Sequence, residues 1–342
     1  MNITRFADVK YITLHSLEGF EIEQAWEIMN KNELAKVNDA LGGFFTRVGD
    51  AAVIYPSLPG LNGELGKNIN GPSIIKVPSW LANPLGRYYL YFAHHAGEFI
   101  RLAYAENIEG PYTVYSPGTL YTSQVTKKTK NFHLASPDVH ANNETQELWM
   151  YFHAPFKGKG IYKDQKQMTF LARSRDGIHF IPGKVALAPF YLRVFHHDNY
   201  VYGIAKNDNK NGVFLRSPDG TTQFERGLEF IDGFRHCAVL EKGNRLWIFF
   251  SRVGDAPERI LVTSIDLSTD WNSWTISPPI PVLEPEFPWE GNDLPIEPSS
   301  YGATGPANAL RDPAIFVENN ELYLFYCVKG EQGIACSKFI SY

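Results

Sequence analysis

The clearest alternation of apolar and polar positions lies between residues 133 and 153. Two short runs that favour β-strands are separated there by a polar Asn-Asn-Glu-Thr turn, and the second run, Leu148 to Phe152, alternates with a period of two. The pattern predicts a β-hairpin. Because its strands are antiparallel, Asp138 and His140 in the first strand and His153 after the second are expected at the same end.

The same order of segments recurs five times along the chain. Each unit contains an apolar run, a polar turn, an aromatic-rich run, a polar loop and a third run that favours a strand. Four-stranded units repeated around an axis form a β-propeller. The sequence therefore predicts an all-β protein with five blades, whose repeats span residues 70–105, 133–173, 190–216, 235–264 and 311–337.

The fifth unit reaches Tyr342 after its third strand, so its fourth and outer strand must come from elsewhere in the chain. Residues 51–55, Ala-Ala-Val-Ile-Tyr, lie just before the first unit and are the expected donor. Pairing of this segment with the last blade would close the ring and protect its sheet edges. We therefore expect residues 51–342 to form one propeller closed by its N- and C-terminal segments.

Residues 1–50 have a different pattern. Between Glu18 and Leu41, apolar residues recur at roughly helical intervals, which indicates one or two helices. These helices are expected either to pack against the propeller or to act as a regulatory or dimerising arm. The prediction is an N-terminal helical arm over residues 1–50.

Composition narrows the class of protein. The chain has 342 residues, 44% of them hydrophobic, and a formal net charge of -5. It has no dense Lys and Arg stripe, which argues against nucleic acid and anionic membranes as partners, and no apolar run of about 18 residues that would span a membrane. The N-terminus lacks a continuous hydrophobic signal core, so a cytoplasmic location is expected. Cys237, Cys327 and Cys336 lack metal-type spacing and are expected to be reduced and buried.

Polar residues concentrate at one phase of the repeat. In a four-stranded antiparallel blade, the start of the first strand and the loop after the second lie on the same face, so each blade contributes two polar clusters to one mouth of the channel. Scattered surface charge would have no such phase. The predicted mouth residues are Asn70, His94, His95, Asp138, His140, His153, Arg193, Arg235, His236, Arg252, Arg311 and Asp312.

This layout resembles the five-bladed propeller glycosidases, both the arabinanase and xylosidase type of glycoside hydrolase family 43 and the invertase and levansucrase type. Arg311-Asp312-Pro313 resembles the Arg-Asp-Pro motif of the latter, and Ser136-Pro137-Asp138 resembles the strand-start acid of the former. The chain is also similar to uncharacterised bacterial propellers. The resemblance covers residues 70–342 and implies a glycoside hydrolase. It is incomplete where those enzymes carry an acid in the first blade and a general-acid Glu in the third, because this chain has Asn70 and Arg193 there.

Glycosidic cleavage needs two carboxyl groups, one protonated and one ionised. Asp138 and Asp312 are the best-placed pair. The linker between the last two units is much longer than the other connections, which is typical of a functional loop. It contains Trp289, which could stack on a sugar ring, and Glu290 and Asp293, either of which could point into the mouth.

Asp138 is the predicted central carboxylate. Arg193, Arg235 and Arg311 are expected nearby and would favour its ionised form, which suits a base, a nucleophile or a charge stabiliser. The proton donor would then be a less well paired acid, and Glu290 is the first candidate.

Other interpretations stay open. The mouth histidines could supply an alternative acid or, together with Asp138, bind zinc or another divalent ion, although no local motif identifies a metal site and no cofactor is certain. A non-catalytic carbohydrate-binding propeller would use the same mouth for binding alone. We expect a small-molecule or oligosaccharide ligand, with anionic sugars among the candidates. The identity of the sugar and the oligomeric state are left open.

Overall fold

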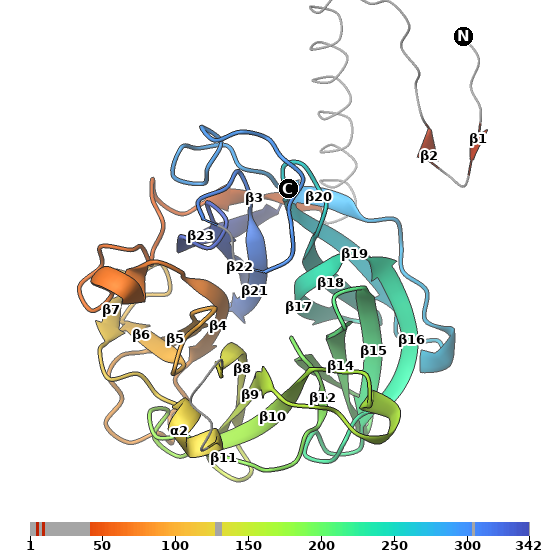
Figure 1. The fold of residues 1–342 in the computed structure, drawn as a ribbon, viewed down its shortest axis with the longest axis horizontal. Helices are drawn as coiled ribbons and strands as arrows, with labels where there is room; N and C mark the ends of the chain where they lie inside the picture. The colour runs from red at the N-terminus through yellow and green to blue at the C-terminus, as the bar shows by residue number, and fades with distance from the viewer. Residues whose placement is uncertain (1–4, 7–8, 11–41, 127–131, 303–304, 342) are drawn as a thin grey trace, which may run out of the picture.

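The computed structural model describes residues 5–6, 9–10, 42–126, 132–302 and 305–341. Within these residues, five antiparallel sheets are arranged around a central axis like the blades of a propeller (Figure 1). The predicted all-β, five-bladed architecture is confirmed. The helical segment predicted between residues 18 and 41 lies outside the described residues. No helix in the described part of the chain is long and apolar enough to cross a membrane.

Each blade follows the chain outward from the axis, with its first strand innermost. The first blade contains β4 (Asn70–Lys76), β5 (Tyr88–Ala93), β6 (Arg101–Ala105) and β7 (Thr113–Tyr115). The second contains β8 (Ala135–Asn142), β9 (Glu147–Pro155), β10 (Gln167–Ser174), β11 (Ile181–Pro182) and β12 (Ala188–Pro189), and the third β13 (Arg193–His197), β14 (Tyr200–Asn207), β15 (Asn211–Ser217) and β16 (Glu225–Asp232). The fourth contains β17 (Phe234–Lys242), β18 (Arg245–Arg252), β19 (Ile260–Asp266) and β20 (Ile280–Leu283), and the fifth β21 (Arg311–Glu318), β22 (Glu321–Val328), β23 (Gly333–Ser341) and β3 (Gly43–Arg47).

Short elements outside the blades complete the described chain. β1 (Arg5–Phe6) and β2 (Val9–Lys10) form a two-residue antiparallel pair. The helical turns are η1 (Gly63–Gly66), α2 (Thr122–Val125), η2 (Gly160–Tyr162) and η3 (Trp271–Ser273).

The hydrophobic core lies between neighbouring blades. Strand β5 is buried at all six positions, because its two faces pack against different blades. Tyr89 and Tyr91 belong to the apolar cluster shared with the second blade, whereas Leu90 and Phe92 belong to the cluster shared with the fifth. This burial explains why the second strand of each unit is rich in aromatic residues. The three cysteines are free and buried, as expected.

A segment from the N-terminal side of the chain closes the last blade. Strand β3 pairs with β23 over Ser337–Ser341, so the outer strand comes from Gly43–Arg47 and not from residues 51–55. Residues 51–55 contribute only an isolated bridge between Ile54 and Ile334 at the start of β23. The ring is therefore closed by N- and C-terminal segments, but through an earlier donor than the sequence pattern suggested.

Two outer turns with nearly identical sequences have the same structure. Asp176 and Asp219 each accept hydrogen bonds from the amides two and three residues ahead. Although burial opposes ionisation, these bonds and those from side-chain donors lower the pKa of both carboxyls to about 2. Gly177 and Gly220 follow with φ of +74° and +69°, and each carbonyl accepts a tyrosine hydroxyl from the preceding blade. These turns therefore join neighbouring blades.

We expect Gly220→Ala to destabilise the protein more than Gly243→Ala. Both glycines have positive φ, which costs an alanine about 1–2 kcal/mol. A Cβ at Gly243 meets no atom within 4 Å, whereas at Gly220 it would lie 2.6 Å from the Tyr151 hydroxyl, and such overpacking costs about 1–3 kcal/mol more. Chemical denaturation would measure the difference, and equal losses of stability would contradict this description of the turn.

Candidate active site at the channel mouth

Four inner strands share an irregularity near their start. The pairing of β4, β8, β17 and β21 with the second strand of each blade shifts register there, and the bulges place Gly71, Ser136, Arg235 and Asp312 at the same height in the ring. The φ angles of Gly71, Ser136 and Asp312 are 59°, 50° and 48°, in a region that side chains other than Gly rarely adopt. Bulges redirect side chains and are frequent beside active sites. This level of the ring is the channel mouth.

Asp312 is the carboxyl group held by this backbone. It is 5% exposed, accepts a hydrogen bond from the Gly71 amide at 3.2 Å and lies 3.5 Å from the His236 ring nitrogen Nδ1. Burial and the neighbouring carboxylate of Glu331 raise the pKa of Asp312, and the lowering effects of nearby arginines do not cancel this rise. Asp312 therefore holds its proton to higher pH than an ordinary aspartate.

Glu331 has the opposite tendency. It lies in the turn between β22 and β23 and accepts hydrogen bonds from Asn68 Nδ2 at 2.5 Å and Asn70 Nδ2 at 3.1 Å, and it pairs with His95 Nδ1 at 3.3 Å. Arg311 Nη1 lies 3.6 Å away. Although Glu331 is buried, these donors and charges lower its pKa. Glu331 therefore loses its proton at lower pH than its neighbour Asp312.

A second buried glutamate fixes two arginines at the mouth. Glu258, in the loop before β19, has no exposed surface and accepts hydrogen bonds from Arg235 Nε at 2.6 Å and Ser251 Oγ at 2.8 Å. Its other oxygen lies 2.9 Å from Arg311 Nε. Arg311 therefore bridges Glu258 and Glu331, and its position is set from both sides. We define the channel-mouth cluster as Asn70, His95, Arg235, Glu258, Arg311, Asp312 and Glu331.

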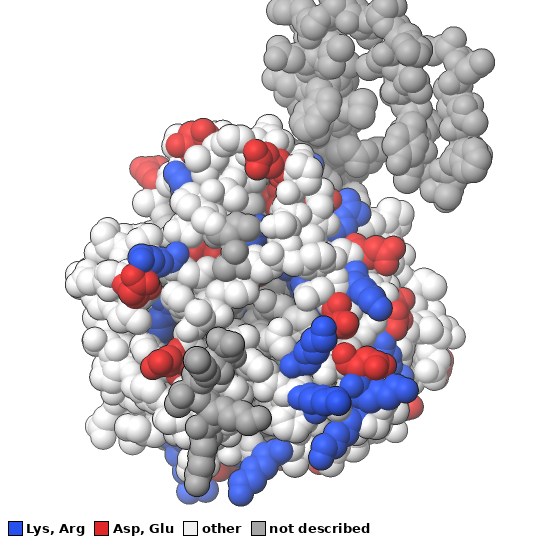
Figure 2. Space-filling model, in the orientation of Figure 1, with Lys and Arg blue, Asp and Glu red and all other residues white. Residues whose placement is uncertain are grey.

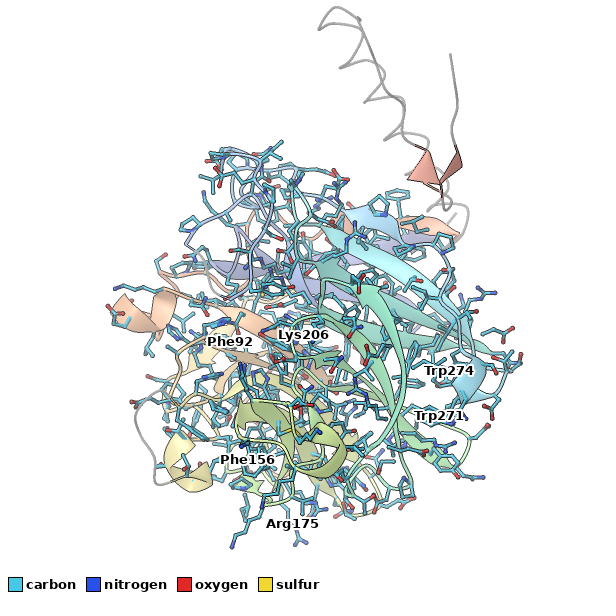
Figure 3. All side chains as sticks on the ribbon, turned by 45° about the vertical axis from the view of Figure 1, so that its right-hand side comes forward. Phe92, Phe156, Arg175, Lys206, Trp271 and Trp274 are labelled. Carbon is cyan, nitrogen blue, oxygen red and sulfur yellow. The ribbon has the colours of Figure 1, made fainter. Side chains whose placement is uncertain are left out.

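One wall of the mouth is aromatic and carries a buried amine. The Tyr191 ring lies edge-on to His153 and to His236, with centroids 4.8 Å apart in each pair. Burial lowers the pKa of both histidines well below the usual value, so both are neutral. Lys206 at the end of β14 is 2% exposed, and its amine lies 5.5 Å from the Tyr191 ring centre. Figure 3 shows Lys206 near the middle of the ring, far from the peripheral Trp271.

Arg193 and Asp138 lie deeper in the channel. Arg193 donates weakly to the carbonyls of Ser136 and Pro72, which belong to the inner strands of two other blades. Asp138 is two positions further along its strand than the Ser136 level, and it accepts hydrogen bonds from the Val194 amide at 3.0 Å and from His140 Nε2 at 2.9 Å.

Asp138 lines a cavity on the side of the channel away from the mouth cluster. The cavity has a volume of about 300 Å³ and is lined by inner-strand residues of all five blades. Although burial opposes ionisation, His140, Arg193 and the Val194 amide lower the pKa of Asp138. Asp138 thus faces the channel as an ionised carboxylate, as expected, but below the level of Asp312.

The long linker between the last two blades reaches the mouth through residues 299–302. Arg235 Nη2 donates to the Ser300 carbonyl at 2.6 Å, and Arg311 Nη1 donates to the Gly302 carbonyl at 3.4 Å. The Tyr301 ring centre lies 5.3 Å from the Lys206 amine. The linker therefore does take part in the mouth, but not through the segment expected from the sequence.

Glu290 and Trp289 lie away from the channel, contrary to expectation. The Glu290 carboxylate is fully buried and binds Arg47 Nε at 3.1 Å, the Tyr326 hydroxyl at 2.9 Å and the Glu286 amide at 2.8 Å. Trp289 stacks on Phe287 with ring centres 5.7 Å apart. These contacts tie the linker to the outer part of the last blade, so the prediction that Glu290 points into the mouth is wrong.

Two other predicted mouth residues form contacts close to them in the sequence. Arg252 is exposed and pairs with Asp255 at 2.8 Å. His94 accepts a hydrogen bond from the Ala96 amide within its own loop. Among the described residues, no group of three or more His, Cys, Asp or Glu side chains is placed to hold a metal ion. The divalent metal that the sequence left open as an alternative has no ligand set in that part of the chain.

The sequence pattern also indicates three mouth residues that are not among the predicted ones, Glu331, Glu258 and Lys206. Glu331 and Glu258 both lie in the loop between the second and third strands, the phase already identified as facing the mouth. Ser174 and Ser217 hold equivalent positions in the second and third blades, and they pair with Leu148 and Val201 on the neighbouring strands. Counted along those strands from the paired residues, Lys206 takes the place in the third blade that His153 takes in the second. Tyr191 had no comparable signal.

The fold places this molecule among the five-bladed propellers with structural neighbours in glycoside hydrolase family 43. An α-L-arabinanase from Cellvibrio cellulosa in complex with arabinohexaose matches with a TM-score of 0.53 at 10% identity, covering 79% of this chain and 91% of the other. A GH43_1 enzyme from Xanthomonas citri gives 0.51 at 12% identity, covering 91% and 92%. An N-acetylgalactosamine deacetylase from F. plautii gives 0.54 at 13% identity, covering 86% and 96%.

At the level of sequence, no family model matches the chain. It is 36% identical over 303 residues to the uncharacterised protein R118 of Acanthamoeba polyphaga mimivirus, covering 78% of this chain and 82% of R118. The chain therefore belongs to the same family as R118.

Proposed function

We propose that the protein is a glycoside hydrolase in which Asp312 is the proton donor and Glu331 the ionised carboxylate. The observation that carries this proposal is the adjacent pair of buried carboxyl groups with opposite pKa shifts, raised for Asp312 and lowered for Glu331. Environments that separate the pKa values of two neighbouring acids are how enzymes assign acid and base roles.

The chemistry follows from these protonation states. Asp312 would give its proton to the glycosidic oxygen as the bond to the anomeric carbon breaks. Glu331 would stabilise the positive charge that develops on the sugar and either activate a water molecule or attack the carbon itself. Arg311 lies between Glu258 and Glu331 and lowers the pKa of Glu331, whereas burial and the charge of Glu331 raise the pKa of Asp312.

We assign Asp138 a positioning role. It contacts Arg193, with 3.9 Å between Arg193 Nε and the Asp138 carboxylate, and Arg193 lies between it and the mouth. This differs from the initial expectation that Asp138 is the central carboxylate. Its ionised state, held by His140 and the Val194 amide, suits a group that orients the arginine.

The structural neighbours support a carbohydrate ligand by their fold. The matched arabinanase is bound to arabinohexaose, and an exo-β-1,3-galactanase from Phanerochaete chrysosporium with a TM-score of 0.51 is bound to β-1,3-galactotriose. The deacetylase, bound to a blood group B trisaccharide, carries the same architecture with another reaction on a sugar. The proposal therefore rests on the carboxyl pair, and the neighbours support only the class of ligand.

A non-catalytic carbohydrate-binding propeller is the second candidate. It is favoured by residues 299–302 at the mouth, because carbonyls of this segment already accept hydrogen bonds from Arg235 and Arg311. A panel of aryl glycosides and oligosaccharides distinguishes the two candidates. Release of reducing ends from at least one of them by the purified protein is expected for the hydrolase. Saturable binding without any release would support the binding protein instead.

The proposed roles predict a bell-shaped pH dependence of kcat/KM. Activity should fall at low pH as Glu331 becomes protonated and at high pH as Asp312 loses its proton. Because the pKa of Glu331 is lowered and that of Asp312 is raised, the plateau should be wider than two ordinary carboxyl groups would give. A single limb, or a plateau that excludes pH 4–5, would contradict the assignment.

His95→Ala should move the acidic limb of that profile to higher pH. The His95 side chain, 34% exposed, is the first group that lowers the pKa of Glu331 against burial, and loss of one such charged partner shifts a carboxyl by about one pH unit. His179→Ala is the control, because His179 is 81% exposed and pairs with Asp176 at an outer turn. Equal profiles for the two variants would show that His95 does not set the ionisation of Glu331.

A further inference from the structure

Lys206 carries a buried amine that has no ion-pair partner in the described part of the chain. It is 2% exposed, and none of the described carboxylates lies within ion-pair distance of its amine. At the same mouth, Arg235 and Arg311 both pair with glutamates. Burying an ammonium group without an anionic partner is costly. A side chain kept in this state at the mouth indicates a partner that arrives with the ligand.

Aromatic rings around Lys206 stabilise the charged form of its amine without forming an ion pair with it. The ring centres of Phe190, Tyr191 and Tyr301 lie 5.8, 5.5 and 5.3 Å from Nζ, within range of cation–π attraction. Burial, and after it the charge of Arg235, lowers the pKa of Lys206 to about 7, although Glu258 raises it in part.

Other groups that influence the Lys206 amine are Asp312, which favours its charged form, and Arg311, which disfavours it. The neutral His153 and His236 rings lie on the same wall. The carboxylates at the mouth are already bound to arginine or amide donors. None of them is therefore available to pair with the Lys206 amine.

Exposed lysines extend this charge along one side of the mouth. Lys157, Lys159, Lys163 and Lys166 lie in the loop between β9 and β10, where Asp164 is the exposed acid. Figure 2 shows Lys and Arg side chains over this side of the face, with Asp and Glu side chains among them. Clustered charge of one sign raises the local concentration of ligands of the other sign.

We propose that the mouth binds a sugar carrying an anionic group, a carboxylate or a phosphate, and that the Lys206 ammonium is the group that receives it. This inference rests on the proposed function for the sugar, but not for the anion. The lysines of the β9–β10 loop attract the ligand, and Lys206 forms the ion pair. The aromatic rings around Lys206 exclude water from that pair.

The test measures binding by calorimetry at pH 6.5 with four probes: glucose, glucuronate, glucose 6-phosphate and inorganic phosphate. The wild type is expected to bind at least one anionic probe at least tenfold more tightly than glucose. Lys206→Met should lose this preference, Lys206→Arg should keep most of it, and the exposed control Lys242→Met should match the wild type. Thermal unfolding of each variant verifies that it is folded.

The pattern of binding identifies the anion. Binding of inorganic phosphate alone assigns the site to free phosphate, whereas binding of only the sugar-linked anions assigns it to the ligand itself. Equal affinities of the wild type for glucose and for all anions would overturn the proposal, as would anion affinities unchanged in a folded Lys206→Met. The readout is binding, so the two proposals can fail separately. Anion preference without turnover would support the anion site and contradict the hydrolase. Turnover of neutral glycans that Lys206→Met does not affect would support the hydrolase and contradict the anion site.

Discussion

Asp312→Asn is expected to lower kcat by about 10²–10⁴-fold while changing ligand affinity by less than about tenfold. An amide of the same shape still accepts the Gly71 amide hydrogen bond, but it has no proton to give to a leaving group. Initial rates on the best glycan from the panel, together with the dissociation constant of the same glycan, measure both quantities. Asp198→Asn, at a surface site 78% exposed, is the control and should leave both unchanged.

The same experiment separates the three channel carboxyls. Glu331→Gln should lower kcat to a similar extent as Asp312→Asn, because both roles are needed in one step. Asp138→Asn should have the smaller effect, since Asp138 acts through Arg193 and the Val194 amide. If Asp138→Asn abolished turnover while Asp312→Asn retained it, the catalytic pair would have to be moved deeper into the channel.

Glu290→Gln is expected to lower the free energy of unfolding by about 3–5 kcal/mol, the usual cost of removing one partner of a buried ion pair. The substitution removes the buried charged partner of Arg47, which is 10% exposed, leaves it only the exposed Glu286, and weakens the contact to Tyr326. Urea denaturation measures the loss, and kcat of the folded fraction should equal that of the wild type.

Glu286→Gln is the matched control for this prediction. Glu286 also pairs with Arg47, at 3.0 Å, but its side chain is 58% exposed. Exposed pairs contribute about 0–1 kcal/mol, so this variant should be close to the wild type in stability. If Glu290→Gln left stability unchanged but abolished turnover, Glu290 would be a catalytic acid after all.

The architecture was predictable because the repeat is encoded locally. Each unit carries its own turns and its own alternation, so the number of blades and the level of Asp312, Arg311 and Arg235 follow from counting along the chain. The donor of the last strand did not follow. Both 43–47 and 51–55 are short runs that can pair, and the choice depends on β23, whose extension to Ser341 needs a partner along its outer half.

The candidate site was predictable only in part, for a related reason. The phase of the repeat identifies a level in the ring but not which side chains meet there. The acid Glu290 was misplaced because its partner, Arg47, is 243 residues away, and nothing in the local pattern pairs the two. Glu331 lies in a loop of the right phase but not next to the end of β22 at Val328, so the residues that border the strands do not include it.

A crystal structure of Asp312→Asn soaked with the glycan that the wild type cleaves fastest would show whether Asp312 and Glu331 act together on a glycan at the channel mouth. A glycosidic oxygen is expected within about 2.6–3.2 Å of the side chain at position 312, with Glu331 at the anomeric carbon. A sugar bound instead in the cavity beside His140, or in the groove of about 620 Å³ formed by Arg173 and Ile181 on the second blade, would contradict this expectation.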